Sequence, residues 1–283
     1  MEKITIPRGD ALVVYQFEGP WDRGVSSLKS QGLDAITLRD LAEARILGGA
    51  NSSVSTRWTW VAENFNYDKD DILIASREFS PLLQYPVEAT ECHRQGKEFY
   101  LSPNDTEKLR RAASSDVNQA MKFGVLLLKR SKILSDIPVE AFGEEDVTSF
   151  LFRDKAKEYG RFLKENGIKN VPLRVAGEAY AQEQGRAFSR ALWAYDLNLN
   201  SALVGYNLIL NDNVGRVSGV RELSAAKRAG ASGASHGAAG AARAGSIGNQ
   251  ALEETLLEAE RQGIGFRYHG RLYLPVDPKV VPK

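Results

Sequence analysis

Cysteine and histidine are scarce in this chain of 283 residues, which has one cysteine and three histidines. A single cysteine excludes an intramolecular disulfide, and this fits a reducing cytoplasm. A multi-histidine metal centre would have to combine Cys92 and His93 with His236 and His269. Neighbouring residues on a helix point about 100° apart and chelate a metal poorly. We therefore expect a packed cysteine beside a surface histidine.

Long apolar runs and an excess of one charge are also missing. No run of about 18 apolar residues occurs, so we expect no membrane span and no membrane partner. The first residues, MEKITIPRGD, lack the apolar core of a secretory signal. Net charge is +1, and hydrophobic and charged residues make up 43% and 26% of the chain. These values indicate an ordinary soluble, cytoplasmic protein and give no global argument for nucleic acid.

The common catalytic and nucleotide-binding signatures are absent. The sequence contains no GxxxxGK[ST], GxGxxG, HExxH, CxxC or GxSxG pattern. No motif in the sequence indicates a resemblance to a known family. No catalytic residue can be assigned from the sequence, and no cofactor is evident.

What the chain does have is a stretch of small residues that divides it. Ala, Gly and Ser dominate residues 224–249, SAAKRAGASGASHGAAGAARAGSIGN, which include no acid. Residues 1–223 before it have the composition of a globular body, with a possible subdomain break near 135–145. Residues 250–283 after it form an appendage. From residue 224 onward, basic residues outnumber acidic ones.

Two interpretations of the stretch 224–249 remain open. A flexible linker is favoured, because so little apolar surface cannot offset the entropy cost of ordering the chain. The alternative is a closely packed helix, since four glycines at spacings of three and four would share one helical face. These are Gly230, Gly233, Gly237 and Gly240. A groove of small residues would let a partner backbone approach closely.

The body mixes strand and helix patterns without a regular alternation, which predicts an α+β fold with a largely antiparallel sheet. Strands are expected near 4–6, 11–17, 72–76, 125–129 and 171–175, and half-buried over 54–61, where Trp58 and Trp60 share a face. Residues 187–221 indicate an antiparallel meander with a turn at 211–213. Helices are expected over 38–47, capped by Thr37 and Asp40, and over 103–123.

The appendage combines a helix over about 250–262 with a hairpin over 265–276. Basic and aromatic residues alternate in the hairpin, and Arg267, His269 and Arg271 could contact a nucleic-acid backbone. Four glutamates on the preceding helix oppose that interpretation. The alternative is a structural hairpin or a protein contact.

Two further groups are candidate sites in the body. Asp68, Asp70 and Asp71 stand before a strand, and clustered carboxylates hold Mg²⁺ or Ca²⁺ through oxygen. A solvated acidic turn is the simpler interpretation. Lys129, Arg130 and Lys132 follow an apolar strand and could bind an anion. A basic loop at a strand end explains them equally.

These observations favour an intracellular binding or assembly protein without a catalytic centre, acting on a protein partner or on itself. The first alternative is a carboxylate enzyme that uses a divalent metal, since acidic sites leave faint traces in a sequence. The second is association with nucleic acid through the basic C-terminal segment.

Overall fold

The computed structural model describes residues 2–4, 12–222, 266–268 and 271–273. The chain divides into two compact units, Met1–Leu223 and Ser224–Lys283. In the second unit the structure describes two short strands, β14 (Phe266–Tyr268) and β15 (Arg271–Tyr273), which pair antiparallel. Their hairpin falls within the range expected from the sequence. The expected helix 250–262, the four glycines and His269 lie outside the described residues.

One mixed sheet organises the first unit, and its 13 strands are mostly antiparallel. The main path runs β1-β2-β13-β4-β11-β12-β10-β9, and β3, β5, β6, β7 and β8 branch from it. Three pairs are parallel: β13 with β4, β10 with β12, and β7 with β8. The strands are β1 (Glu2–Ile4), β2 (Leu12–Glu18), β3 (Asp34–Ala35), β4 (Thr59–Asp68), β5 (Asp71–Ala75), β6 (Phe99–Tyr100), β7 (Ala113–Ser114), β8 (Val125–Lys129), β9 (Asp136–Pro138), β10 (Asn170–Arg174), β11 (Phe188–Ala194), β12 (Leu203–Val204) and β13 (Arg216–Glu222).

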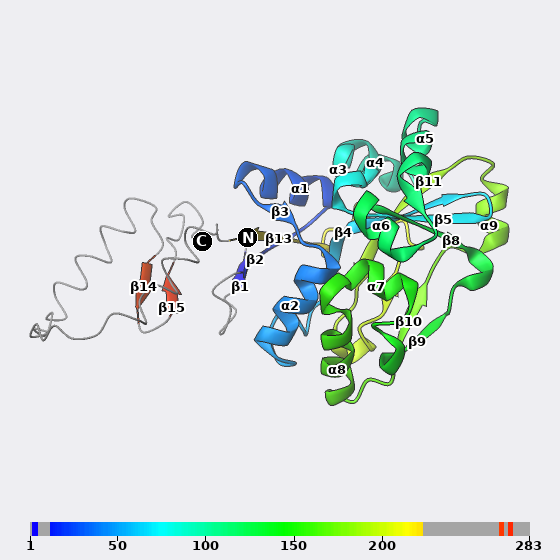
Figure 1. Ribbon diagram of the computed structural model, residues 1–283. Helices are drawn as coiled ribbons and strands as arrows, with labels where there is room; N and C mark the ends of the chain where they lie inside the picture. Colours follow the sequence, from blue (N-terminus) through cyan, green and yellow to red (C-terminus); the bar gives the residue numbers. More distant parts are fainter. Residues whose placement is uncertain (1, 5–11, 223–265, 269–270, 274–283) are drawn as a thin grey trace, which may run out of the picture. The chain divides into compact units, whose positions relative to one another are not determined.

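Helices cover both faces of this sheet (Figure 1). The α-helices are α1 (Trp21–Ser30), α2 (Leu38–Gly48), α3 (Pro81–Gln84), α4 (Pro86–Arg94), α5 (Pro103–Ala112), α6 (Val117–Phe123), α7 (Asp146–Phe152), α8 (Ala156–Glu165) and α9 (Glu178–Glu183). Short 3-10 turns are η1 (Arg77–Phe79), η2 (Arg130–Lys132), η3 (Val139–Ala141), η4 (Arg153–Lys155) and η5 (Leu197–Leu199). The α+β class expected from the sequence is confirmed.

Two hydrophobic cores lie on opposite faces of the sheet. One packs α2, α7 and α8 against side chains such as Val61 and Phe65 of β4. The other packs α1, α3 and α4 against the alternate side chains, including Trp60 and Ala62. Successive side chains of a strand point to opposite faces, so β4 is buried along its whole length.

Several expected elements are confirmed where their signals are local. The helix predicted from Thr37 runs over Leu38–Gly48, and Thr37 and Asp40 form a reciprocal capping box. The apolar run VLLLK is β8 and lies beside β5. The acidic turn is followed by β5, and residues 170–174 form β10.

The half-buried strand expected over 54–61 is wrong. The strand begins at Thr59 and both of its faces are buried, because helices pack on each side of the sheet. Val54 and Ser55 are also buried, but they lie in the turn that leads to the strand. Alternation over 54–60 therefore reflects turn packing instead of strand geometry.

The single helix expected over 103–123 is interrupted. It ends at Ala112, where Ala113 adopts an extended conformation, and residues 113–114 pair with β8 as β7. A second helix then begins at Val117, because the side chain of Asp116 accepts the backbone N–H of Gln119. The apolar residues expected on one helical face are therefore divided between α5 and α6.

The antiparallel meander expected over 187–221 is also wrong. β11 and β12 pair antiparallel, but β13 does not join them. It lies between β2 and β4 and pairs with β2 from Arg216 to Glu222. Residues 205–215 are therefore a long connection across one end of the sheet, which contains the expected turn near Asn211.

Arg45 joins three segments in the interior without any carboxylate partner. It is fully buried, and it donates to the Val54 and Tyr195 carbonyls at 2.9 and 2.8 Å. It also donates to the hydroxyls of Tyr159 and Ser201 at 2.8 and 3.0 Å. These bonds fix the end of β11 relative to α2 and α8.

Among the described residues, no helix is long and apolar enough to cross a membrane.

Candidate functional site

The three aspartates predicted as metal ligands lie at the β4–β5 turn and are paired with other side chains. Asp68 accepts Arg110 at 2.6 Å, and Asp71 contacts Lys129 at 2.5 Å. Asp70 accepts the side-chain amide of Gln182 at 2.9 Å. In the described part of the chain, no group of three or more His, Cys, Asp and Glu side chains could hold a metal ion. Metal binding here stays a prediction.

The basic group at the end of β8 is used largely within the fold. Lys129 pairs with Asp71, as above. Arg130 lies over the ring of Tyr67, 5.2 Å from its centroid, and donates to the Ala176 carbonyl at 2.5 Å. Burial lowers the pKa of Arg130. Lys132 is exposed on η2. Of the basic hairpin residues, Arg267 and Arg271 are described only as backbone on β14 and β15.

The expected surface histidine is in fact buried. His93 lies on α4 and is 3% exposed, and its Nδ1 accepts the Leu210 N–H at 3.2 Å. Burial lowers its pKa to about 3, with a smaller contribution from Arg190, so the ring is neutral in the folded protein. His93 is buried because the 205–215 connection packs on α4. The local sequence does not predict this contact. Cys92 is partly buried, as expected.

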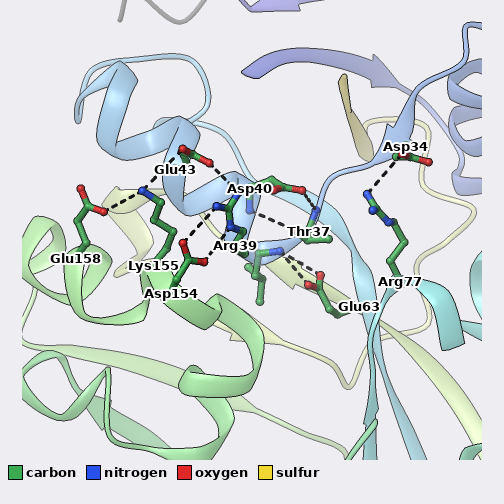
Figure 2. Close-up of polar contacts among 11 residues, drawn as sticks. Asp34, Thr37, Arg39, Asp40, Glu43, Glu63, Arg77, Asp154, Lys155 and Glu158 are labelled. Carbon is green, nitrogen blue, oxygen red and sulfur yellow. Dashed lines mark hydrogen bonds and ion pairs between the residues drawn. The ribbon is translucent and has the colours of Figure 1, made fainter. Parts of the chain in front are cut away.

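A dense charged network surrounds the N-terminal half of α2 (Figure 2). Arg39 pairs with Glu43 at 2.9 Å and with Asp154 at 3.1 Å. Lys155 extends the network to Glu43 and Glu158 at 3.8 and 3.1 Å. Hydrogen bonding and attraction to Asp154 and Glu43 hold the pKa of Arg39 above its ordinary value. Opposite charges alternate, so the network fastens α2 to η4 and α8.

Beside this network lies Glu63, a titratable side chain whose pKa is strongly shifted by the fold. It projects from β4 beneath the start of α2, and both carboxyl oxygens accept the Leu38 N–H at 3.2 and 3.1 Å (Figure 2). It is 5% exposed. Burial raises its pKa to about 8, although the hydrogen bond from Leu38 and the charge of Arg153 act in the opposite direction.

A row of aromatic side chains forms the second distinctive feature. We call Trp58, Trp193, Tyr195 and Tyr206 the aromatic strip. The Trp58 and Trp193 rings lie 5.1 Å apart, and Tyr195 stacks on Trp193 at 5.7 Å. Burial raises the pKa of Tyr195, and interactions with Tyr206 and Asp196 raise it further. At the other end, Arg216 lies over Trp58 at 5.9 Å.

The two tyrosines of the strip belong to two loops, residues 195–202 and 205–215, that follow β11 and β12, whereas Trp193 is on β11 and Trp58 precedes β4. Together they carry Asn198, Asn200, Asn207, Asn211 and Asn213 besides the two tyrosines. The exposed large hydrophobic side chains here are Leu199, Tyr206 and Val214, at 53%, 43% and 57%. The loops thus present aromatic, apolar and amide groups to solvent.

Backbone hydrogen bonds hold both loops in place. In the first, Asp196 caps η5, and Asn200 and Ser201 adopt left-handed conformations with φ of 55° and 52°. In the second, the Leu210 carbonyl accepts Trp21 N–H at 2.8 Å, and its N–H bonds His93. Gly215 closes the loop against Trp60, because an added Cβ would lie 1.8 Å from that ring. The loops are irregular but fixed.

Sequence reasoning missed this surface. It treated residues 187–221 as an antiparallel meander with a turn at 211–213, which assigns both tyrosines and the asparagines before residue 211 to strands. The available signal was composition: five asparagines between 198 and 213 are unfavourable in strands and typical of loops. The contacts of Trp58 with Trp193 and with Arg216 depend on tertiary structure, so the local sequence does not predict them.

No protein-family model matches the chain, and no curated protein matches it either. A solved structure is similar to it, described as "Accommodation of massive sequence variation in Nanoarchaeota by the C-type lectin fold". The TM-score is 0.56 and the sequence identity 18%, over 77% of this chain and all of the other. At this identity the likeness concerns the fold alone. The chain is therefore similar in fold to a C-type lectin-fold protein from Nanoarchaeota.

Proposed function

We propose that this chain is a non-enzymatic binding protein that presents the exposed side chains of the loops 195–202 and 205–215 to a protein partner. The observation that carries the proposal is that Leu199, Tyr206 and Val214 are exposed on these loops. Trp193 of the aromatic strip is buried and packs on Trp58 and Tyr195. Self-association through the same surface is the related possibility.

The composition of the surface supports a protein partner. Tyrosine, tryptophan and arginine are the residues in which binding energy at protein interfaces concentrates. Tyrosine with asparagine, glycine and serine is also the composition of antibody binding loops, where rigid aromatic rings supply contact area and amides supply adaptable hydrogen bonds. Residues 195–215 have the second composition, with Tyr195, Tyr206 and five asparagines, whereas Trp58, Trp193 and Arg216 lie outside this range.

The rigidity of the loops supports the proposal as well. A loop that is ordered before binding does not lose conformational entropy when the partner arrives, so more of the contact energy appears as affinity. The anchors at Asp196, Leu210 and Gly215 supply that order from the scaffold. The backbone is thus fixed while the exposed side chains are free to match a partner.

The similar solved structure also supports a binding function. It is described as showing that the C-type lectin fold accommodates massive sequence variation in Nanoarchaeota. A scaffold that tolerates variation at its surface suits recognition, since side chains can change without loss of the fold. By this analogy, the loops of the present chain are the variable contact surface.

Two alternatives stay predictions. A divalent-metal enzyme would need its carboxylates free, and in the described residues those of Asp68 and Asp71 are paired with cations. Association with nucleic acid would depend on Arg267, His269 and Arg271. A cytoplasmic location and the absence of a cofactor also remain expectations.

The test is site-directed capture followed by a measurement with purified components. A photoreactive benzoylphenylalanine replaces Tyr206 in the full chain, and cross-linked proteins from cells that express it are identified. The purified partner is then titrated against variants. Tyr206→Ala should raise Kd at least about 30-fold, the loss that defines a hot spot.

The matched control is Tyr85→Ala, which removes a tyrosine of similar exposure, 38% against 43%, from a different element. It should leave Kd unchanged. The same titration with a second copy of this chain tests self-association. Equal affinities of the Tyr206→Ala and wild-type chains for every captured protein would show that the loops 195–202 and 205–215 are not the binding surface.

A further inference from the structure

A separate groove lies between η1, α5 and α6, away from the aromatic strip. Its volume is about 560 Å³, and Phe79, Glu107, Lys108, Arg111, Ala112 and Phe123 are among the residues that line it. This volume falls in the range of small-molecule sites, about 300–1,000 Å³. A stable protein interface buries on the order of 800 Å² from each partner. The groove therefore suits a small ligand better than a folded partner.

Two phenylalanine rings give the groove its apolar walls. Phe123, at the end of α6, is 49% exposed. Phe79 is held against the chain at Gly124, where an added Cβ would lie 2.6 Å from the ring. Gly124 has a left-handed φ of 93° that favours glycine, and the absence of a side chain there leaves room for the ring of Phe79. One wall thus packs against the chain and the other is open to solvent.

Each ring carries a cation. Lys108 Nζ lies over Phe79, and Lys122 Nζ lies over Phe123, both 5.7 Å from the ring centroid. Neither lysine forms an ion pair with the described residues. Arg111 is different, since it pairs with Glu107 at 2.8 Å along α5. The groove therefore combines apolar walls with the ammonium group of Lys108, whereas Lys122 contacts Phe123 but is not among the lining residues.

We propose that this groove binds an amphipathic organic anion, a carboxylate carried on an aryl or alkyl body. The apolar body would lie against Phe79 and Phe123, where burial of hydrocarbon is favourable. The carboxylate would contact the ammonium of Lys108, and such charge-assisted bonds are stronger than neutral ones. A neutral analogue of the same shape would lose that contact.

The experiment titrates the full chain by calorimetry with 4-phenylbutyrate and with 4-phenylbutanol, which has the same body without the charge. The expected result is one site per chain and a Kd for the acid at least fivefold lower than for the alcohol. Phe123→Ala should weaken both ligands at least tenfold. Lys108→Gln should weaken the acid and leave the alcohol unchanged.

Matched controls distinguish binding in the groove from nonspecific binding. Leu134→Ala removes another exposed apolar side chain, 43% exposed, and Lys169→Gln removes an exposed lysine that belongs to no candidate anion site. Both should bind like the wild-type chain. The inference is overturned if neither ligand binds, if acid and alcohol bind equally, or if the control variants lose as much affinity as the groove variants. Because none of these residues belongs to the loops 195–202 and 205–215, failure here leaves the proposed function intact.

Discussion

Glu63 shows how a single buried carboxyl couples stability to pH. Its pKa of about 8 in the folded protein lies above its ordinary value of 4.5, so between these values the folded state binds more protons than the unfolded state. The free energy of unfolding therefore falls as pH rises across this window and levels off above it. Each tenfold difference in proton affinity is worth about 1.4 kcal/mol.

We predict that Glu63→Gln removes this pH dependence. An amide keeps the shape and the acceptor for Leu38 but cannot ionise, so its stability above pH 8 should exceed that of the wild-type chain by a few kcal/mol. Chemical denaturation at intervals from pH 5 to 9 measures it. Glu158→Gln, on the exposed edge of the charged network, is the control. Parallel wild-type and Glu63→Gln profiles would contradict the prediction.

Which individual residues matter could be predicted only in part. Asp40 and Thr37 were found because a capping box is written within four residues. Glu63 and Arg45 were not, because their partners come from distant parts of the chain: Leu38 for the first, Tyr159 and Ser201 for the second. The burial that raises the pKa of Glu63 likewise depends on α2 covering β4.

At the scale of elements, the loop 205–215 depends on one acceptor from α4. His93→Phe fills the same space but cannot accept the Leu210 N–H, and a buried donor without a partner costs about 1–3 kcal/mol. We predict faster hydrogen exchange at Leu210 and its neighbours and weaker binding through Tyr206. His93→Asn, which retains an acceptor, should restore part of the protection. Unchanged exchange in His93→Phe would show that other contacts hold the loop.

His93 also couples stability to pH, but with the opposite sign to Glu63: its contribution to the free energy of unfolding increases as pH rises. The pKa of His93 is about 3 when folded and 6.5 ordinarily, so the unfolded state binds more protons between these values. Stability from this group is present above pH 6.5 and is lost as pH falls toward 3. His93→Phe should flatten the acid limb of the stability curve, which thermal melts between pH 4 and 7 record.

Elements with local signals were predictable and their partners were not. Helix α2 and strand β8 follow from caps and apolar runs within their own residues. The pairing of β13 with β2 instead of β12 leaves no trace in either segment, because any strand with one buried edge can pair with several others. That pairing decides whether residues 205–215 are sheet or an exposed connection, and so the proposed binding surface was not predicted.

At the scale of the whole molecule, residues 1–223 contain both hydrophobic cores. We predict that they fold without residues 224–283. The truncated chain should unfold in one cooperative thermal transition with a midpoint within a few degrees of the full chain, as measured by calorimetry. It should also bind 4-phenylbutyrate with the affinity of the full chain. A molten or insoluble product would place the boundary elsewhere.

The pairing of β2 with β13 also has a consequence for how the protein is made. β2 ends at Glu18 and its partner begins at Arg216, so the central strands cannot be completed until residues 216–222 have left the ribosome. At about 5–20 residues per second, that delay is on the order of 10–40 s. Throughout it, β2 and one edge of β4 have no β13 between them, and exposed strand edges pair readily with other chains. Synthesis of this protein therefore includes an interval in which the edges of β2 and β4 that later pair with β13 lack that strand.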